Sequence, residues 1–345
     1  MKEVFKLDKG YHMEEALRNY FLQSGYYVAR GVPFRYEGFD VTDIDLWLYS
    51  RISPVSREIS IVDVKNKKTP QAFERIFWVR GLKIATQASS AIVATQDRRK
   101  EVKEFGRNLD VLVLDGAFLS RLQRLEDFRP CRLLQEEFTG LVESYELEKL
   151  DGGWLKRLAE SKSLLSSGLS FDSCNEWLYH AQFFLEQSFA KPQQRDIALR
   201  CYYLLCSFIA LASDYILREI LFLELADRVN VFTNGFTFGS RGSKGMRQIL
   251  DITMNLVEQH AERGKAIASE VRSSVRRSLA GVNSTVLAEY LVKNEVARSL
   301  FVVAKELEQM AMSRDFVHHS TAGVEVRSFL FCLIDFYGFE RTKFA

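Results

Sequence analysis

The sequence predicts an α/β domain with a mixed sheet, followed by an all-α helical domain. Two segments near the N-terminus, 41–49 and 58–65, alternate hydrophobic and polar residues as half-buried strands do. In the C-terminal part of the chain the hydrophobic residues instead recur with the 3.6-residue period of helices. The 345 residues suffice for two domains of ordinary size. We place the first domain at 1–125, a connector at 126–168 and the helical domain at 169–345.

The first domain is expected to begin with a helix and three strands. Gly25 follows the first helical stripe at a position that favours helix termination, and Pro70 suits the first turn of a later helix. The apolar segments near 90 and 110 are typical of buried strands. In order, the expected elements are a helix at 11–24, strands at 26–34, 41–49 and 58–65, a helix at 72–88, a strand at 90–95, a helix, and a strand at 109–116.

The second domain is expected to be a bundle of long helices. The helical periodicity covers residues 171–189, 196–226, 246–275, 283–312 and 324–339. The most apolar stretch, 202–217, is interrupted by Asp214 and is too short to span a bilayer, so we expect a buried core helix.

Composition limits the class of protein. The net charge of +2 is too small to indicate a polyanion partner by itself, although basic residues cluster at 65–68 and 98–100. The cysteines are five, widely spaced and without a C-x-x-C pair, which argues against a disulfide framework or a zinc site. The N-terminus lacks the apolar core of a signal peptide. We expect a soluble cytoplasmic protein with no membrane partner.

An acid and a lysine share one face of the strand predicted at 58–65. Side chains alternate along a strand, so Asp63 and Lys65 project on the same side. Asp45 lies on the preceding strand, on the face opposite its apolar stripe. If the two strands pair as a hairpin, the two carboxylates converge and suit Mg²⁺ or Mn²⁺. The side chain of Lys65 can then orient a water or stabilise charge on a phosphate. The alternative interpretation is an ordinary amphipathic hairpin on which Asp45, Asp63 and Lys65 face solvent.

Residues 10–95 resemble the PD-(D/E)xK, or restriction-endonuclease-like, nuclease superfamily. TDIDLWLY matches the aspartate strand of that superfamily, with Asp45 at the metal-binding position. IVDVKNKK matches the (D/E)-x-K strand through Asp63 and Lys65, and GYHMEEALRNYFLQSGYYV matches the leading helix, where Glu14 fits the acidic position. The resemblance implies a magnesium-dependent nuclease in which Asp45 and Asp63, together with Glu14, hold the metal ion and Lys65 assists the attack of water.

Some positions of this resemblance stay open. Glu15 is the alternative to Glu14, and a helix after the lysine strand often supplies a further polar residue, for which Gln71 and Gln87 are candidates. The chain lacks the proline that precedes the first aspartate in the superfamily, so Asp43 is an alternative to Asp45. We prefer Asp45, because the pattern acid-hydrophobic-acid-hydrophobic usually keeps its second acid.

The implied function is hydrolysis of phosphodiester bonds in nucleic acid, DNA or RNA, with DNA favoured. Basic side chains near the site would position the nucleic-acid backbone without reading bases: Lys67, Lys68, Arg98 and Arg99. Members of this superfamily, and of the second superfamily considered below, commonly work as dimers, so we expect a homodimer. By analogy, a prokaryotic restriction or defence role with a partner protein of that system is expected.

A second motif lies near the C-terminus, where Arg314 and His319 form R-x-x-x-x-H with Asp315 after the arginine. This resembles the HEPN superfamily of helical domains, which are often metal-independent ribonucleases. The resemblance implies His319 as general base or acid and Arg314 as the phosphate ligand; the simpler alternative is a capping and salt-bridge cluster. Two other functions therefore remain open: a HEPN-type ribonuclease or toxin that uses the N-terminal domain for recognition, and a catalytically silent nucleic-acid-binding or scaffold protein.

Overall fold

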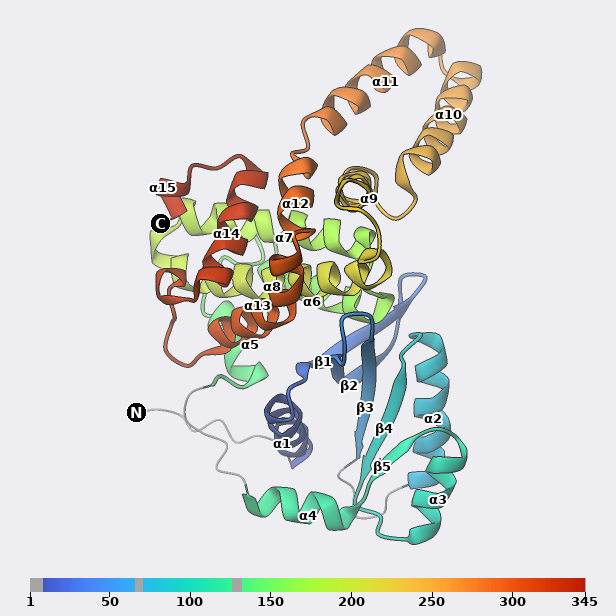
Figure 1. Cartoon of the computed structure of the whole chain (residues 1–345), viewed down its shortest axis with the longest axis vertical. Coiled ribbons are helices and arrows are strands. Elements are labelled where there is room, and N and C mark those ends of the chain that lie inside the picture. The colour runs from blue at the N-terminus through green and yellow to red at the C-terminus, as the bar shows by residue number, and fades with distance from the viewer. Residues whose placement is uncertain (1–8, 66–70, 126–131, 345) are drawn as a thin grey trace. The chain divides into compact units, whose positions relative to one another are not determined.

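The computed structural model describes residues 9–65, 71–125 and 132–344, which form two compact units. The first unit extends to Gly168 and includes Met312–Phe316; the second comprises Leu169–Ala311 and the residues from Val317 onward. The first is an α/β unit and the second is helical, so the predicted order of α/β and all-α parts is confirmed (Figure 1).

The first unit follows the predicted order of elements. Its elements are α1 (Lys9–Gln23), β1 (Tyr27–Tyr36), β2 (Phe39–Arg51), β3 (Arg57–Lys65), α2 (Ala72–Ala85), β4 (Ser90–Thr95), α3 (Lys100–Asn108), β5 (Leu112–Leu114), α4 (Gly116–Leu125), α5 (Gln135–Glu143) and α6 (Trp154–Ser167). The described strands form one five-stranded sheet in the order β1-β2-β3-β4-β5. The β1-β2 and β2-β3 pairs are antiparallel and the β3-β4 and β4-β5 pairs are parallel, so the sheet is mixed as predicted.

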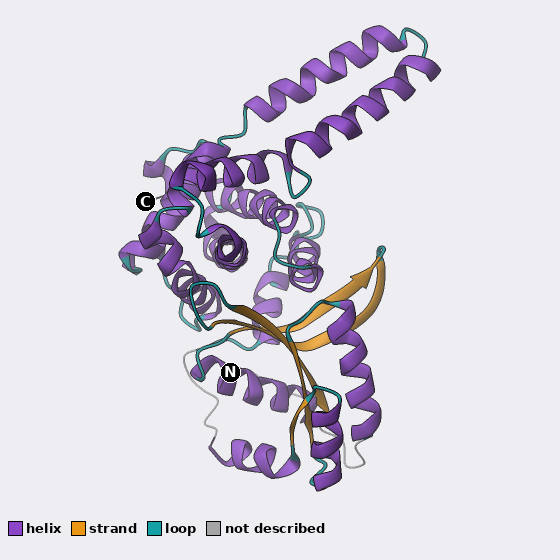
Figure 2. Cartoon of the chain, turned by 45° about the vertical axis from the view of Figure 1, so that its right-hand side comes forward, coloured by secondary structure: helices purple, strands orange, loops and turns teal. Residues whose placement is uncertain are grey.

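Helices cover both faces of the sheet (Figure 2). On one face, side chains of α1 and α4 pack on the alternate apolar residues of the central strands: Met13, Leu17, Phe21, Leu119 and Leu122 pack on Leu46, Leu48, Val62 and Val64. Helices α2 and α3 pack against the strands β3, β4 and β5 through buried residues such as Ile76 and Val79. A Cβ atom at Gly106 of α3 would lie 2.5 Å from a Val113 methyl, so this close helix–strand approach requires glycine.

Two boundaries in the first unit differ from the prediction. The strand expected at 109–116 is only Leu112–Leu114, because Asp110 has a positive φ of 56° and Val111 N–H still bonds to Gly106 O of the preceding helix. The described part of the expected connector, 132–168, contains α5 and α6 and belongs to the first unit. Helix α6 packs on β1, with Trp154 fully buried.

The second unit contains the remaining helices. They are α7 (Phe171–Ala190), α8 (Arg195–Ile220), α9 (Leu225–Phe238), α10 (Gly242–His260), α11 (Gly264–Ala280), α12 (Ser284–Leu291), α13 (Asn294–Met312), α14 (Val324–Tyr337) and α15 (Arg341–Phe344), with short 3₁₀ turns at Pro192–Gln194 and His319–Thr321. Three of the long helices predicted from periodicity are each two helices. The helix expected at 246–275 breaks where Arg263 adopts a left-handed conformation, with φ 59°.

Helix α8 is the core of the second unit. The segment Pro192–Ile220 is long and apolar enough to cross a membrane by length and composition, but 83% of its most apolar window is buried inside the protein. The predicted core helix at 202–217 is therefore confirmed, which is consistent with a soluble protein. The cysteines that the structure describes, Cys174, Cys201, Cys206 and Cys332, are free and buried.

Candidate active site

The strand register brings Asp45 and Asp63 together. The β2-β3 ladder ends with the pair Leu46–Val62, and its register, continued by one step, leads to Asp45 on β2 and Asp63 on β3. Residues that face each other across antiparallel strands project on the same side of the sheet. The predicted hairpin of the two strands is therefore confirmed, with the apolar stripe of β2 and β3 on the opposite face.

Asp45 closes the end of this ladder with its side chain. Its Oδ2 accepts a hydrogen bond of 2.6 Å from the backbone N–H of Val64. Burial raises the pKa of Asp45; the Val64 N–H and the nearby charges of Lys65 and Arg75 lower it, and Asp43 raises it further. The net shift is upward, so the positive charges around Asp45 do not fully compensate the loss of solvent.

Asp63 is held by an arginine that the sequence argument did not identify. The carboxylate is 7% exposed, and Arg75 of α2 donates to both of its oxygens, at 2.8 Å from Nε to Oδ2 and through Nη2 to Oδ1. Partial burial lowers the pKa of Arg75, although a guanidinium stays protonated in proteins. A signal did exist in the sequence: only a short link joins β3 to α2, so the first turn of α2 must lie near the end of β3.

Lys65 and the arginines that follow β4, Arg98 and Arg99, lie at the same end of the sheet. Lys65 is partly exposed and pairs with Thr95 in the parallel β3-β4 ladder, so the segment that follows β4 starts beside it. In that segment Arg98 donates to Ser120 at 3.0 Å, and Arg99 forms an ion pair of 2.6 Å with Asp97. Lys67 and Lys68 lie outside the described residues.

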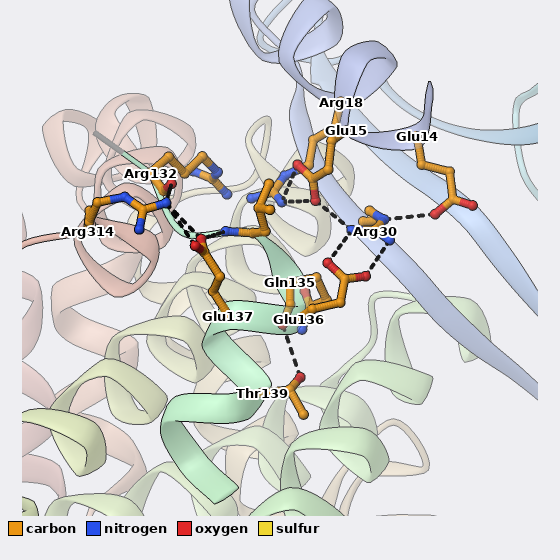
Figure 3. Close-up of polar contacts among 11 residues, drawn as sticks. Glu14, Glu15, Arg18, Arg30, Arg132, Gln135, Glu136, Glu137, Thr139 and Arg314 are labelled. Carbon is orange, nitrogen blue, oxygen red and sulfur yellow. Dashed lines mark hydrogen bonds and ion pairs between the residues drawn. The ribbon is translucent and has the colours of Figure 1, made fainter. Parts of the chain in front are cut away.

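The two predicted acids of α1 differ in their surroundings (Figure 3). Glu15 is buried against two arginines, with ion pairs of 2.9 Å to Arg18 and 2.7 Å to Arg30. Burial opposes ionisation of Glu15, but these arginines hold its pKa below the usual value. Glu14 pairs with Arg30 at 2.8 Å, and its pKa is raised, first by burial and further by the charge of Asp45. Glu14 is thus the acid of α1 that lies within the electrostatic reach of Asp45.

Arg30 is the centre of this network (Figure 3). It is 4% exposed and also donates to both oxygens of Glu136 in α5, at 3.0 and 2.6 Å. A residue of α5 therefore completes the charge balance around α1 and β1. The ion pair of Arg30 with Glu136 could not be predicted, because the two residues are 106 positions apart and no local sequence pattern links them.

The remaining candidates of the nuclease resemblance are placed as follows. Asp43 is exposed, lies two residues before Asp45 and pairs with Pro33 of β1. Asp45 is nearer to the last pair of the β2-β3 ladder, so the register favours Asp45 over Asp43. Gln71 is exposed directly before α2, and its carbonyl oxygen accepts from Arg75 N–H at 3.0 Å. Gln87 follows the far end of the 14-residue helix α2, so the structure does not bring it to the site.

Lys162 of α6 is a further titratable group that the sequence analysis missed. Desolvation, with the charges of Arg18 and Arg30, lowers its pKa to about 7, and Asp43 opposes this shift. A lysine with such a pKa exchanges protons near neutral pH. Its position on α6 was not predictable, because that segment was expected to be a connector.

The C-terminal motif does not form an accessible acid–base pair. Arg314 donates to both oxygens of Glu137, at 3.1 and 2.8 Å, and to Arg132 O at 3.3 Å (Figure 3). His319 is 1% exposed, its ring stacks on Phe344 at 3.8 Å, and burial lowers its pKa to about 4. Asp315 is exposed. Arg314 thus pairs with Glu137 and not with Asp315, and His319 packs in the interior of the second unit.

The site offers two carboxylates for a divalent cation. Within the described ranges, no three His, Cys, Asp or Glu side chains form a metal-binding group. Mg²⁺ is often held by one or two carboxylates together with waters and substrate phosphates, and the raised pKa of Asp45 indicates a carboxylate that a cation would stabilise. Asp45 and Asp63 therefore fit such a cation, provided that Arg75 shares Asp63 with it. Comparison of the chain with protein-family models, curated proteins and solved structures gives no match.

Proposed function

We propose that the first unit hydrolyses phosphodiester bonds of nucleic acid with a divalent cation held by Asp45 and Asp63. The observation that carries this proposal is the placement of Asp45 and Asp63 directly beyond the last pair of the β2-β3 ladder. There Asp45 Oδ2 accepts from the N–H of Val64, and Lys65 follows on the same face of β3 as Asp63. This arrangement supports the PD-(D/E)xK resemblance and assigns a distinct task to each residue.

In the proposed reaction a water oxygen forms a bond to phosphorus while the bond from phosphorus to the leaving oxygen breaks. A bound Mg²⁺ or Mn²⁺ would activate water and stabilise charge on the phosphate. Lys65 holds the attacking water or a phosphate oxygen in place beside Asp63. The proton of the water passes to solvent or to a neighbouring base, and the leaving oxygen takes a proton.

Arg75 has two roles in this account. With no cation bound, its guanidinium neutralises the buried Asp63 carboxylate. When a cation takes over part of this charge, the planar guanidinium is suited to contact a phosphate oxygen of the substrate. Glu14 supports the site through its charge, because Arg30 holds its carboxylate.

The resemblance also supports the broader parts of the proposal: DNA as the favoured substrate, a homodimer in the cytoplasm, and a prokaryotic restriction or defence role with a partner protein. Lys67, Lys68, Arg98 and Arg99 would contact the backbone of the nucleic acid. A HEPN-type ribonuclease centred on Arg314, Asp315 and His319 is disfavoured by the burial of His319. A catalytically silent binding protein is the remaining alternative.

The test is a cleavage assay on labelled single- and double-stranded DNA and RNA, with Mg²⁺, with Mn²⁺ and with EDTA. We expect cleavage that requires a metal and that falls at least about 100-fold in Lys65→Ala. Lys156→Ala, which removes an exposed lysine of α6, is the matched control. Cleavage of RNA that persists in EDTA and in Lys65→Ala would reject the proposal, and so would the absence of cleavage on all substrates.

A further inference from the structure

A groove lined by apolar side chains lies between the β1-β2 hairpin and helix α2. Its lining includes Phe34, Val41, Phe77, Trp78 and Leu82, and its volume is about 250 Å³. We name it the Trp78 groove. Phe77 is 61% exposed and Trp78 is 43% exposed, whereas large aromatic side chains usually bury their rings. Two exposed aromatic rings beside one groove are typical of a binding surface.

One residue of the candidate active site also contacts a side chain that lines the groove. Arg75, whose guanidinium binds Asp63, lies over the ring of Trp78 with its Cζ 5.6 Å from the ring centre. Arg75 therefore links the ring of Trp78 to the carboxylate of Asp63.

Cationic and aromatic side chains lie together on the helical layer that forms one wall of the groove. Helices α2 and α3 carry six lysines and arginines and three glutamates, and acids of neighbouring segments pair with some of these cations: Asp63 with Arg75, Asp110 with Lys83 and Asp115 with Lys103. Aromatic rings and cations alternate on this layer: Arg99 lies over Phe73 at 5.3 Å, and Phe73 and Phe77 both pack edge-on against Phe105. This combination suits a ligand with flat rings and negative charges.

We propose that the Trp78 groove binds unpaired nucleobases by stacking, so that the substrate class of the candidate active site is nucleic acid with single-stranded character. Every base has a π face, and stacking on aromatic side chains is the usual way in which proteins hold single strands without reading sequence. In a duplex these faces are already stacked on neighbouring bases. The selection of cleavage substrates rests on the proposed function, whereas the binding of single strands does not.

Tryptophan fluorescence provides the test on the full chain. Trp47, Trp154 and Trp177 are at most 1% exposed, so a change that a ligand produces by direct contact reports on Trp78. The probes are a mixed-sequence single-stranded oligodeoxynucleotide and the duplex of the same length, titrated in EDTA to prevent cleavage. We expect the single strand to quench the emission and to bind more tightly than the duplex.

Three substitutions on α2 separate stacking from general effects. Trp78→Ala should weaken binding of the single strand at least about fivefold, and Trp78→Phe, which keeps an aromatic ring, should weaken it less. Ile84→Ala is the matched control, because Ile84 is exposed on the same helix but does not line the groove, and it should bind as the parent does. Circular dichroism of each variant checks the fold.

The outcomes separate this inference from the proposed function. Equal affinity for duplex and single strand, an unchanged affinity in Trp78→Ala, or quenching that follows protein concentration without oligonucleotide would overturn the inference; the last would indicate self-association. Metal-dependent cleavage of duplex that is unchanged in Trp78→Ala would overturn it while the nuclease proposal stands. Single-strand binding that depends on Trp78, without cleavage in Mg²⁺, would support the groove and reject the nuclease.

Discussion

Among individual residues, Asp45 is, with Glu14, a carboxylate whose surroundings favour the neutral form. Asp63 has Arg75 and Glu15 has two arginines, but the pKa of Asp45 is raised by burial. A carboxylate kept under such conditions costs folding stability, which proteins commonly tolerate at functional sites. This cost is what a bound cation would remove.

Asp45→Asn should therefore stabilise the protein and abolish cleavage. The raised pKa means that the folded state holds the Asp45 proton more tightly than the unfolded chain does, so stability falls as pH rises through the titration range of this group. The asparagine has no charge to lose, and its Oδ1 can still accept from Val64 N–H. We expect a Tm at pH 7 that is higher by about 1–3 °C, measured by thermal unfolding in EDTA. A Tm below that of the parent would contradict this account.

His319 should act on stability and not on cleavage. Its pKa of about 4 lies below the usual value near 6.5, so the unfolded chain binds the proton more readily and stability is lost as pH falls from about 6.5 to 4. The full shift corresponds to about 3 kcal/mol. His319→Gln should flatten this pH dependence, measured by urea unfolding, and should leave metal-dependent cleavage within about twofold of the parent. Cleavage in EDTA that His319→Gln abolishes without loss of stability would support the HEPN alternative.

The sequence predicted the residues of the strands well and their partners poorly. Alternation is a local property, so the apolar faces of β2 and β3 and the shared face of Asp63 and Lys65 followed from it. The ion pair of Asp63 with Arg75 joins residues on two elements, and the bonds of Arg30 to Glu136 join residues 106 positions apart. Such pairs depend on tertiary packing, which a single sequence does not reveal.

At the level of elements, the buried ion-pair network connects α1, β1 and α5. Arg30 of β1 contacts Glu14 and Glu15 of α1 and Glu136 of α5. This network explains why the described part of the expected connector belongs to the first unit. Its helix α5 supplies the carboxylate of Glu136 to the buried guanidinium of Arg30. A charge-rich helix is hard to distinguish from a polar connector in sequence, so the ion pair of Glu136 in α5 with Arg30 was not predicted.

Arg30→Ala should destabilise the protein far more than Arg35→Ala. Removing Arg30 leaves two buried glutamates without their shared cation, a change that typically costs about 3–5 kcal/mol. Arg35, on the same strand, pairs with the exposed Asp40, and such surface pairs contribute less than about 1 kcal/mol. Urea unfolding of the two variants provides the comparison. Equal losses would show that the network contributes no more than a surface pair.

For the whole molecule, the residues of the proposed phosphodiester hydrolysis lie in the first unit. Asp45, Asp63, Lys65 and Arg75 all belong to it, whereas His319 is in the core of the second. The helical periodicity predicted the second unit but not where its helices break, because a break such as the one at Arg263 depends on a single left-handed residue.

Direct measurement of Mn²⁺ binding tests the central claim that Asp45 and Asp63 form a cation site. Titration of the full chain, followed by electron paramagnetic resonance of free Mn²⁺, should show binding in the parent and at least about tenfold weaker binding in Asp63→Asn. Arg75→Ala, which removes the competing guanidinium, should bind Mn²⁺ more tightly than the parent. The exposed pair partner Asp40→Asn is the control and should not differ from the parent. Binding that is unchanged in Asp63→Asn, or no binding in the parent, would contradict the account.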